Sequence, residues 1–269
     1  IFSQLLEHLN DSHTGIYNPA KSEEYISGYS LNEQSALRFS ESLITSKYLD
    51  YRTEIPTETN LSYGKIKDKN IGYIYIGAED GQSPEKIDGI IDDLKSFNAI
   101  ILDLRQNEGG SDRYAARIAG AFADSERYIY SVQTRNGKKH SDFDEKKMYH
   151  TKKQGDEQFL KPVIVLTDRA TISAGEILLL HLKSYDHVTQ IGDTTAGDFS
   201  DVSNIRFLPN GWGYHYSIMM YLLPDGSSLD GIGHVPDIYI KNNQDDINNE
   251  TDKVIETAID YLYDNYSIE

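Results

Sequence analysis

Runs of apolar residues predict four strands in the middle of the chain. They lie at 71–76, 99–104, 162–167 and 188–191. The runs at 99–104 and 162–167 are apolar almost throughout, which is typical of strands that are covered on both faces of a sheet. Helical patterns alternate with these runs, so the sequence predicts an α/β fold.

Apolar residues at helical spacing predict four helices, at 1–10, 83–97, 113–122 and 251–263. Ile1, Leu5, Leu6 and Leu9 share one face of the first helix, and Pro84 suits the first turn of the second. Ser30, three residues before Glu33, forms a capping box that predicts a short helix. The alternating segment 204–224 predicts a β-hairpin around Asn210 and Gly211, and Asn136-Gly137 is another hairpin signal.

Composition excludes several classes of function. The net charge is −17 and the sequence pI is about 4.8, so nucleic acid and anionic membranes are unsuitable partners. The chain has no cysteine, which excludes disulfides and cysteine-ligated metals, and no apolar run approaches the length of a membrane span. The chain opens within a helix and without methionine, so we expect a trimmed chain whose preceding segment carried its address.

Ser173 lies between the predicted strand 162–167 and an apolar helix that begins near Ala174. A serine in such a turn presents its hydroxyl at the carboxyl edge of a sheet, beside the free amides of a helix N-terminus. Those amides can stabilise an oxyanion, so Ser173 is a candidate nucleophile. The alternative is that Ser173 only caps the helix, which is the commoner role of a serine at this position.

Two adjacent glycines follow the buried strand 99–104. Gly109 and Gly110 allow the backbone to turn and expose its amides, and they could lie beside Ser173 if the two strands are neighbours. One of their amides, with that of Ser173 or Ala174, would then form an oxyanion hole. The alternative is an ordinary turn, with Asp103 and Arg105 as a structural ion pair.

Three histidines are candidates for a general base, because imidazole titrates near neutrality. His13 lies beside small polar residues at a predicted helix exit, His215 lies in the predicted hairpin, and His234 lies in a glycine-rich segment. Asp230 precedes that segment and could orient an imidazole, although Asp and Gly are also common in turns.

Four motifs in a fixed order resemble the C-terminal-processing and tricorn-core serine peptidase family. They are DLR-x-N-x-GG from Asp103, T-x-SAGE from Thr171, G-x-x-T-x-G from Gly192 and DG-x4-G-x-G-x-x-PD from Asp225. The resemblance covers about residues 71–240 and reaches His13 through Asp-Ser-His. It implies a ClpP/crotonase-like ββα core sheet with flanking helices, to which we add a short N-terminal helical segment and a C-terminal β-hairpin.

The resemblance also favours one branch of that family. In the Ser-Lys branch a lysine follows the G-x-x-T-x-G segment, whereas this chain has Asp198 there. The tricorn-like branch uses a Ser-His-Ser-Glu tetrad; Ser12-His13 matches its Ser-His pair, and Asp230 falls at its glutamate. The resemblance therefore implies Ser173, His13, Asp230 and Ser12 as catalytic residues, with Asp198 outside the mechanism. Only 57 residues separate His13 from Ile71, fewer than a PDZ domain needs.

These patterns predict a serine endopeptidase that acts on peptides or proteins through an acyl-enzyme and needs neither metal nor organic cofactor. Gly109, Gly110 and Ala174 would supply the oxyanion hole. The alternatives are a silent relative that binds peptides or hydrophobic ligands, or an esterase with the same serine. We expect residues 1–60 to form an N-terminal helical segment that contributes the Ser-His pair and residues 61–269 to form the peptidase core, in an extracytoplasmic protein. The patterns indicate no oligomeric state.

Overall fold

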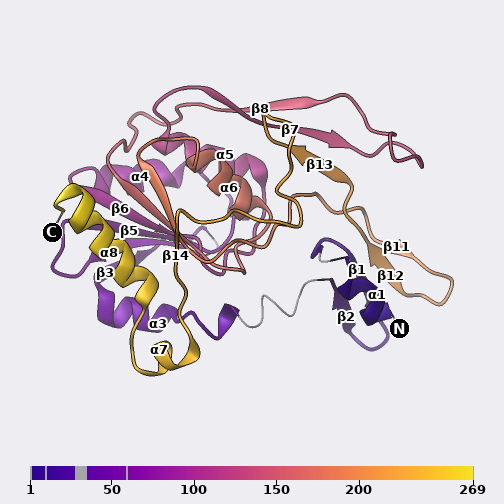
Figure 1. The fold of residues 1–269 in the computed structure, drawn as a ribbon, viewed down its shortest axis with the longest axis horizontal. Helices are drawn as coiled ribbons and strands as arrows, with labels where there is room; N and C mark the ends of the chain where they lie inside the picture. The colour runs from indigo at the N-terminus through magenta and orange to yellow at the C-terminus, as the bar shows by residue number, and fades with distance from the viewer. Residues whose placement is uncertain (1, 10, 28–34, 59, 269) are drawn as a thin grey trace.

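The computed structural model describes residues 2–9, 11–27, 35–58 and 60–268, and a seven-stranded sheet is its centre (Figure 1). The strand order is β14-β10-β9-β6-β5-β4-β3. The strands β5, β6, β9, β10 and β14 pair in parallel, whereas β3 pairs with β4, and β4 with β5, in the antiparallel sense. The strands are β3 (Leu49–Glu54), β4 (Leu61–Ile66), β5 (Ile71–Ile76), β6 (Ala99–Asp103), β9 (Val163–Thr167), β10 (Val188–Gly192) and β14 (Ile238–Tyr239). The predicted α/β fold class is confirmed.

Helices cover both faces of this sheet, so successive strand residues are buried on opposite sides. One face packs against α4 (Lys86–Leu94), α5 (Asp112–Ala119) and α6 (Ala174–Leu182), and includes Ile74, Ile76, Ile100, Leu102, Val163 and Val165. The other packs against α8 (Lys253–Tyr266), with α3 (Glu41–Leu43) and η1 (Ile44–Tyr48), and includes Ile71, Tyr73, Tyr75, Ile101, Ile164 and Leu166. Short helices η2 (Gly120–Phe122) and α7 (Gln244–Asn248) complete this part of the chain.

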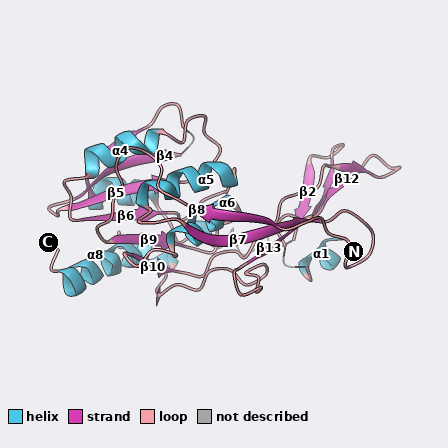
Figure 2. Cartoon of the chain, turned by 90° about the horizontal axis from the view of Figure 1, so that it is seen from above, coloured by secondary structure: helices cyan, strands magenta, loops and turns pink. Residues whose placement is uncertain are grey.

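Two smaller sheets extend away from the core (Figure 2). One has the order β13-β7-β8, from β13 (Met219–Leu222), β7 (Arg127–Thr134) and β8 (Lys147–Thr151). The other has the order β11-β12-β1-β2, from β11 (Arg206–Phe207), β12 (Gly213–His215), β1 (Gly15–Asn18) and β2 (Glu23–Ile26), and lies beside α1 (Phe2–Glu7). The antiparallel pairing of β1 with β12 joins the start of the chain to the predicted hairpin.

The four strands predicted from apolar runs are confirmed to within one residue at each end. The predicted hairpin is confirmed for β11 and β12 only, because β13 turns away and pairs with β7. The 83–97 helix is shorter than predicted, and the helix predicted around Ser30 and Glu33 lies outside the described residues. The N-terminal segment, expected to be helical, also contains β1 and β2, and β3 within 1–60 is part of the central sheet.

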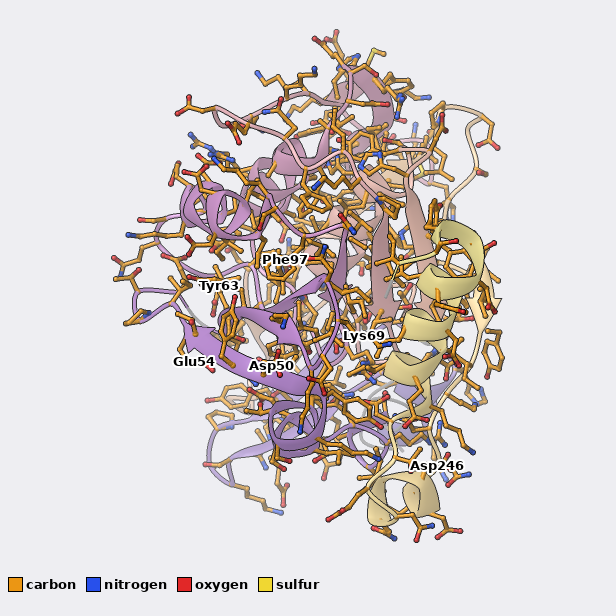
Figure 3. The ribbon with its side chains drawn as sticks, turned by 90° about the vertical axis from the view of Figure 1, so that its left-hand side faces the viewer. Asp50, Glu54, Tyr63, Lys69, Phe97 and Asp246 are labelled. Carbon is orange, nitrogen blue, oxygen red and sulfur yellow. The ribbon has the colours of Figure 1, made fainter. Side chains whose placement is uncertain are left out.

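The edge strand β3 carries charged residues on its exposed side, among them Asp50 and Glu54 (Figure 3). Asp50 pairs with Lys65 of the neighbouring strand at 2.6 Å. Charges on an edge strand oppose its pairing with another chain.

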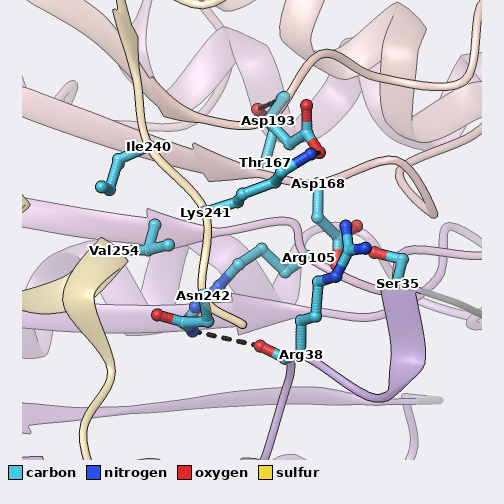
Figure 4. Close-up of a pocket in the computed structure, with 10 residues that line it drawn as sticks. All are labelled: Ser35, Arg38, Arg105, Thr167, Asp168, Asp193, Ile240, Lys241, Asn242 and Val254. Carbon is cyan, nitrogen blue, oxygen red and sulfur yellow. Dashed lines mark hydrogen bonds and ion pairs between the residues drawn. The ribbon is translucent and has the colours of Figure 1, made fainter. Parts of the chain in front are cut away.

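A buried ion-pair network fixes the carboxyl end of β6 to the start of α8. The Arg105 guanidinium donates to both carboxylate oxygens of Asp103, at 2.9 and 2.6 Å, and to both of Asp252, at 3.0 and 2.9 Å. Asp252 also caps α8 by accepting from the amides of Val254 and Ile255. Figure 4 shows Arg105 beside Asn242, whose side chain binds the same Asp252 at 3.1 Å. The structural ion pair considered for Asp103 and Arg105 is therefore present.

We expect Arg105→Met to lower the free energy of unfolding by about 3–5 kcal/mol, because two buried carboxylates would lose their cation. Urea unfolding followed by far-UV circular dichroism measures this loss. The control is Lys95→Met, which removes an exposed ion pair and should change stability by less than about 1 kcal/mol. A loss below about 1 kcal/mol for Arg105→Met would contradict a structural role for the network.

Glu79 is a buried carboxyl group, and no cation pairs with it in the described part of the chain. Its Oε1 accepts from the Asn107 side chain at 2.9 Å, while Oε2 has no partner. Burial raises the pKa of Glu79 to about 8. The unfolded chain therefore releases this proton near the ordinary pKa of a glutamate, whereas the folded chain keeps it until about pH 8.

The stability contributed by protonated Glu79 is thus complete below about pH 4.5 and is lost as pH rises to about 8. We expect Glu79→Gln to gain stability relative to the wild type between pH 5 and pH 9, by on the order of 2–4 kcal/mol. Urea unfolding of both proteins at the two pH values measures this difference. Glu176 titrates in the same direction but is present in both proteins, so the comparison isolates Glu79. A difference that stays constant with pH would contradict a protonated Glu79.

Candidate active site

Ser173 lies in the turn between β9 and α6 in a backbone conformation that is unusual for serine. Its φ is 52° and its ψ is −122°, and its side chain makes no capping hydrogen bond to α6. The alternative that Ser173 serves as a side-chain cap is therefore not supported. Its Oγ instead lies 3.3 Å from Nε2 of His13. A residue held in a sparsely populated conformation with its hydroxyl on an imidazole suits a nucleophile better than a cap.

His13 reaches Ser173 from the other end of the sequence because the backbone around it is held in three places. Its amide donates to Asp11 Oδ1 at 3.0 Å, and its carbonyl accepts from Nδ1 of His215 at 2.8 Å. β1, which begins two residues later, pairs with β12 and so anchors the loop. These contacts hold the imidazole beside the hydroxyl, with Nε2 at 3.3 Å from Oγ.

The other two histidine candidates do not contact Ser173. His234 is fully buried, Nε2 donates to the Glu176 carbonyl at 3.0 Å, and burial lowers the pKa of His234 to about 3. It is therefore a neutral structural residue. His215 contacts the main chain of His13. Of the three candidates, His13 alone is brought to the serine.

The acidic residues around His13 are arranged differently from the sequence expectation. Ser12 donates its hydroxyl to Oδ2 of Asp198 and its amide to Oδ1 of Asp198, the latter at 3.1 Å. Asp230 accepts from the Phe199 amide at 3.2 Å and, within the described residues, forms no hydrogen bond with Ser12 or His13. Burial raises the pKa of Asp230, and the charge of His13 acts in the opposite direction. Asp230 thus interacts with His13 through space, while Asp198 is bonded to its neighbour Ser12.

The glycine pair lies beside Ser173, as β6 and β9 are adjacent in the sheet. A Cβ on Gly109 would stand 2.7 Å from Cβ of Ser173, and its φ of 78° also favours glycine. The Gly109 amide already donates to Oδ1 of Asn107 at 2.8 Å. The amides of Gly110 and Ala174 donate to no group within the described residues, so these two are the open donors beside the serine. Gly109 shapes the turn and its amide is occupied.

A cavity of about 320 Å3 adjoins this site. Its lining includes Ser173, Gly110, Asp112, Met219 and Tyr221. Tyr221 donates to the carboxylate of Asp112 at 2.7 Å, and burial raises the pKa of that carboxyl. The cavity offers room for a substrate side chain next to the candidate nucleophile.

Sequence reasoning missed Glu176, which organises the loop beside the serine. This fully buried residue accepts from the Thr195 hydroxyl at 2.6 Å and from the amides of Gly197 and Asp198 at 2.8 and 2.7 Å. The available signal was a glutamate in the apolar first turn of a helix, where an unpaired charge is costly unless it is bonded.

Asp11, His13 and Asp198 also bring one potential metal ligand each within 4.8 Å of one another. Both oxygens of Asp11 accept from the Ser217 hydroxyl, at 2.9 and 2.8 Å, and both oxygens of Asp198 accept from Ser12. A cation would have to displace these donors. The arrangement therefore fits hydrogen bonding better than metal coordination.

A family model described as peptidase family S41 matches residues 70–240. The carboxy-terminal processing protease CtpA of Bacillus subtilis (strain 168) is 30% identical over 189 residues, which are 70% of this chain and 38% of CtpA. CtpB of the same organism is 30% identical over 205 residues, 73% of this chain and 40% of CtpB. The match thus spans 40% or less of the length of these two relatives.

Solved structures show the same fold. A protein of Parabacteroides merdae ATCC 43184 superposes with a TM-score of 0.83 at 26% identity, over 97% of this chain and 81% of that one. Mature CPAF complexed with lactacystin gives a TM-score of 0.64 at 14% identity, over 80% of this chain and 55% of CPAF, which is a likeness of fold alone. The family match covers well over half of the sequence and contains Ser173, and we conclude that the chain belongs to peptidase family S41.

Proposed function

We propose that this chain is a serine endopeptidase that cleaves peptide bonds through an acyl-enzyme, with Ser173 as nucleophile and His13 as general base. The observation that carries the proposal is the 3.3 Å approach of His13 Nε2 to the Ser173 hydroxyl at the start of α6. Membership of family S41 and the names of the curated relatives support the same reaction class.

In the proposed reaction, Nε2 of His13 takes the hydroxyl proton as Ser173 Oγ attacks the peptide carbonyl. The amides of Gly110 and Ala174 stabilise the oxyanion, and each such donor is typically worth about 3 kcal/mol. His13 then gives its proton to the leaving amine. In the second half of the reaction water attacks the acyl group while His13 takes one of its protons, and His13 returns that proton to Ser173 Oγ. Ser12 and Asp230 are proposed to position and polarise the imidazole, Asp230 through its charge.

We propose peptides or proteins as substrates, in an extracytoplasmic setting. The acidic chain suits neither nucleic acid nor anionic lipid, and none of the described helices is long and apolar enough to cross a bilayer. The 320 Å3 cavity beside Ser173 would hold one substrate side chain. Secretion of a tagged full-length protein from its host tests the location.

We expect a fluorophosphonate to label wild-type protein once, on Ser173, and Ser173→Ala to abolish the label. Intact-mass spectrometry with peptide mapping measures this. We expect His13→Ala to lower both labelling rate and peptide turnover by about 1,000-fold or more, since the hydroxyl loses its base.

His140→Ala is the matched control, because His140 is exposed. His215→Ala should lower turnover far less than His13→Ala, because His215 donates to the His13 carbonyl and the other two anchors of that loop remain. Equal losses in His13→Ala and His215→Ala would mean that His13 is not the base. Labelling with turnover of activated esters but not of peptides would favour an esterase, and absence of labelling would favour a silent binding protein.

A further inference from the structure

Resting on this proposed function, we propose that Asp198, acting through Ser12, is the carboxylate that positions and charge-stabilises His13. The Ser12 amide and hydroxyl bind one carboxylate oxygen each, so Asp198 has a fixed orientation next to the residue that precedes the base. From the sequence we expected Asp198 to stand outside the mechanism and Asp230 to be the acid. The proposal reverses that order.

The ring of His13 needs such a partner. Its Nδ1 is buried and has no hydrogen-bond partner, while its Nε2 faces Ser173. A carboxylate oxygen of Asp198 lies within 4.8 Å of a ring nitrogen of His13. At this separation a small movement, or the Ser12 hydroxyl as a bridge, would connect the carboxylate to the imidazole by hydrogen bonds. Once Nε2 accepts the serine proton, Nδ1–H carries part of the positive charge, and the Asp198 carboxylate is an anion close to this ring.

Asp198 is itself a buried carboxylate without an ordinary counter-ion. It is 4% exposed, and no lysine or arginine in the described residues forms an ion pair with it. A buried anion is costly unless it is hydrogen-bonded or meets a cation. The imidazolium that forms on His13 during the reaction is the cation this site can supply.

The position of Asp198 is fixed from the same helix that carries Ser173. The Asp198 amide donates to Oε2 of Glu176 at 2.7 Å, and the Gly197 amide donates to Oε1 at 2.8 Å. Glu176 and Ser173 are three residues apart at the start of α6. Nucleophile and positioning acid therefore share one rigid support, as precise catalytic geometry requires.

Other carboxylates near His13 are less suited to this role. The charges of Asp112 and Asp230 act on His13 through space, and Asp230 is bonded to the Phe199 amide. Asp11 is committed to the His13 amide and to the hydroxyls of Thr14 and Ser217. His215 faces the main chain. Asp198 alone among these acids is bonded to the side chain of Ser12.

The test compares Asp198→Asn with Asp230→Asn, using kcat and KM for a peptide substrate across pH. We expect Asp198→Asn to lower kcat by about 100-fold or more with KM nearly unchanged. The acid limb of the pH–kcat profile of this variant should move to lower pH, because the protonated imidazole loses a nearby negative charge. Asp198→Glu should restore part of kcat and the original limb. Asp230→Asn should lower kcat less than about tenfold.

Each other result overturns the proposal. A loss in Asp198→Asn without movement of the acid limb would mean that Asp198 is structural, and a larger loss with a moved limb in Asp230→Asn would make Asp230 the acid. If Asp198→Asn does not fold by circular dichroism, Ser12→Ala replaces it and must lower kcat and move the same limb. Labelling of Ser173 in the wild type reports on the proposed function separately, so its failure is distinguishable from that of Asp198.

Discussion

The site depends on the buried carboxylate of Glu176. It lies in the first turn of α6, and its side chain accepts three hydrogen bonds from residues 195–198. These bonds fasten a loop without regular structure to the helix that begins beside Ser173. Burial raises the pKa of Glu176 to about 8, because ionising this carboxyl group inside the protein is costly. That cost is understandable if the loop must hold Asp198 in one place.

The same requirement for fixed distances explains why the segment around His13 meets residues about 200 positions later in the chain. Ser12 and His13 lie in the loop that precedes the short strand β1. That strand is held by its pairing with β12, 200 residues later. Bringing such distant segments together costs chain entropy, which the pairings of β1 and the contacts of Asp11 with Ser217 offset. The base is thus positioned by tertiary contacts, while the nucleophile is positioned by the local turn between β9 and α6.

This difference between local and distant positioning decides what the sequence could predict. The strands at 71–76 and 162–167 follow from their apolar runs, and the exposed serine follows from the strand-turn-helix around Ser173. β1 and β2 escaped prediction because each is only four residues long, and β1 is ordered by its pairing with β12, far along the chain. The contact of Ser12 with Asp198 spans 186 residues, so no spacing rule reveals it. Motif order instead favoured Asp230, one methylene shorter than the glutamate it would replace.

Residues with unusual backbone conformations lie together around Ser173, and their close packing depends on one another. Ser173 has a positive φ that suits glycine better, and Gly109 faces it so closely that a Cβ would stand 2.7 Å from that of the serine. Asn107 occupies the Gly109 amide and also binds Glu79, whose backbone in turn bonds to Gly109 and Ser111. The turn is therefore held by hydrogen bonds that do not involve Ser173. Gly110 lines the cavity together with Ser173, and its amide donates to no group within the described residues, which leaves it available as an oxyanion donor.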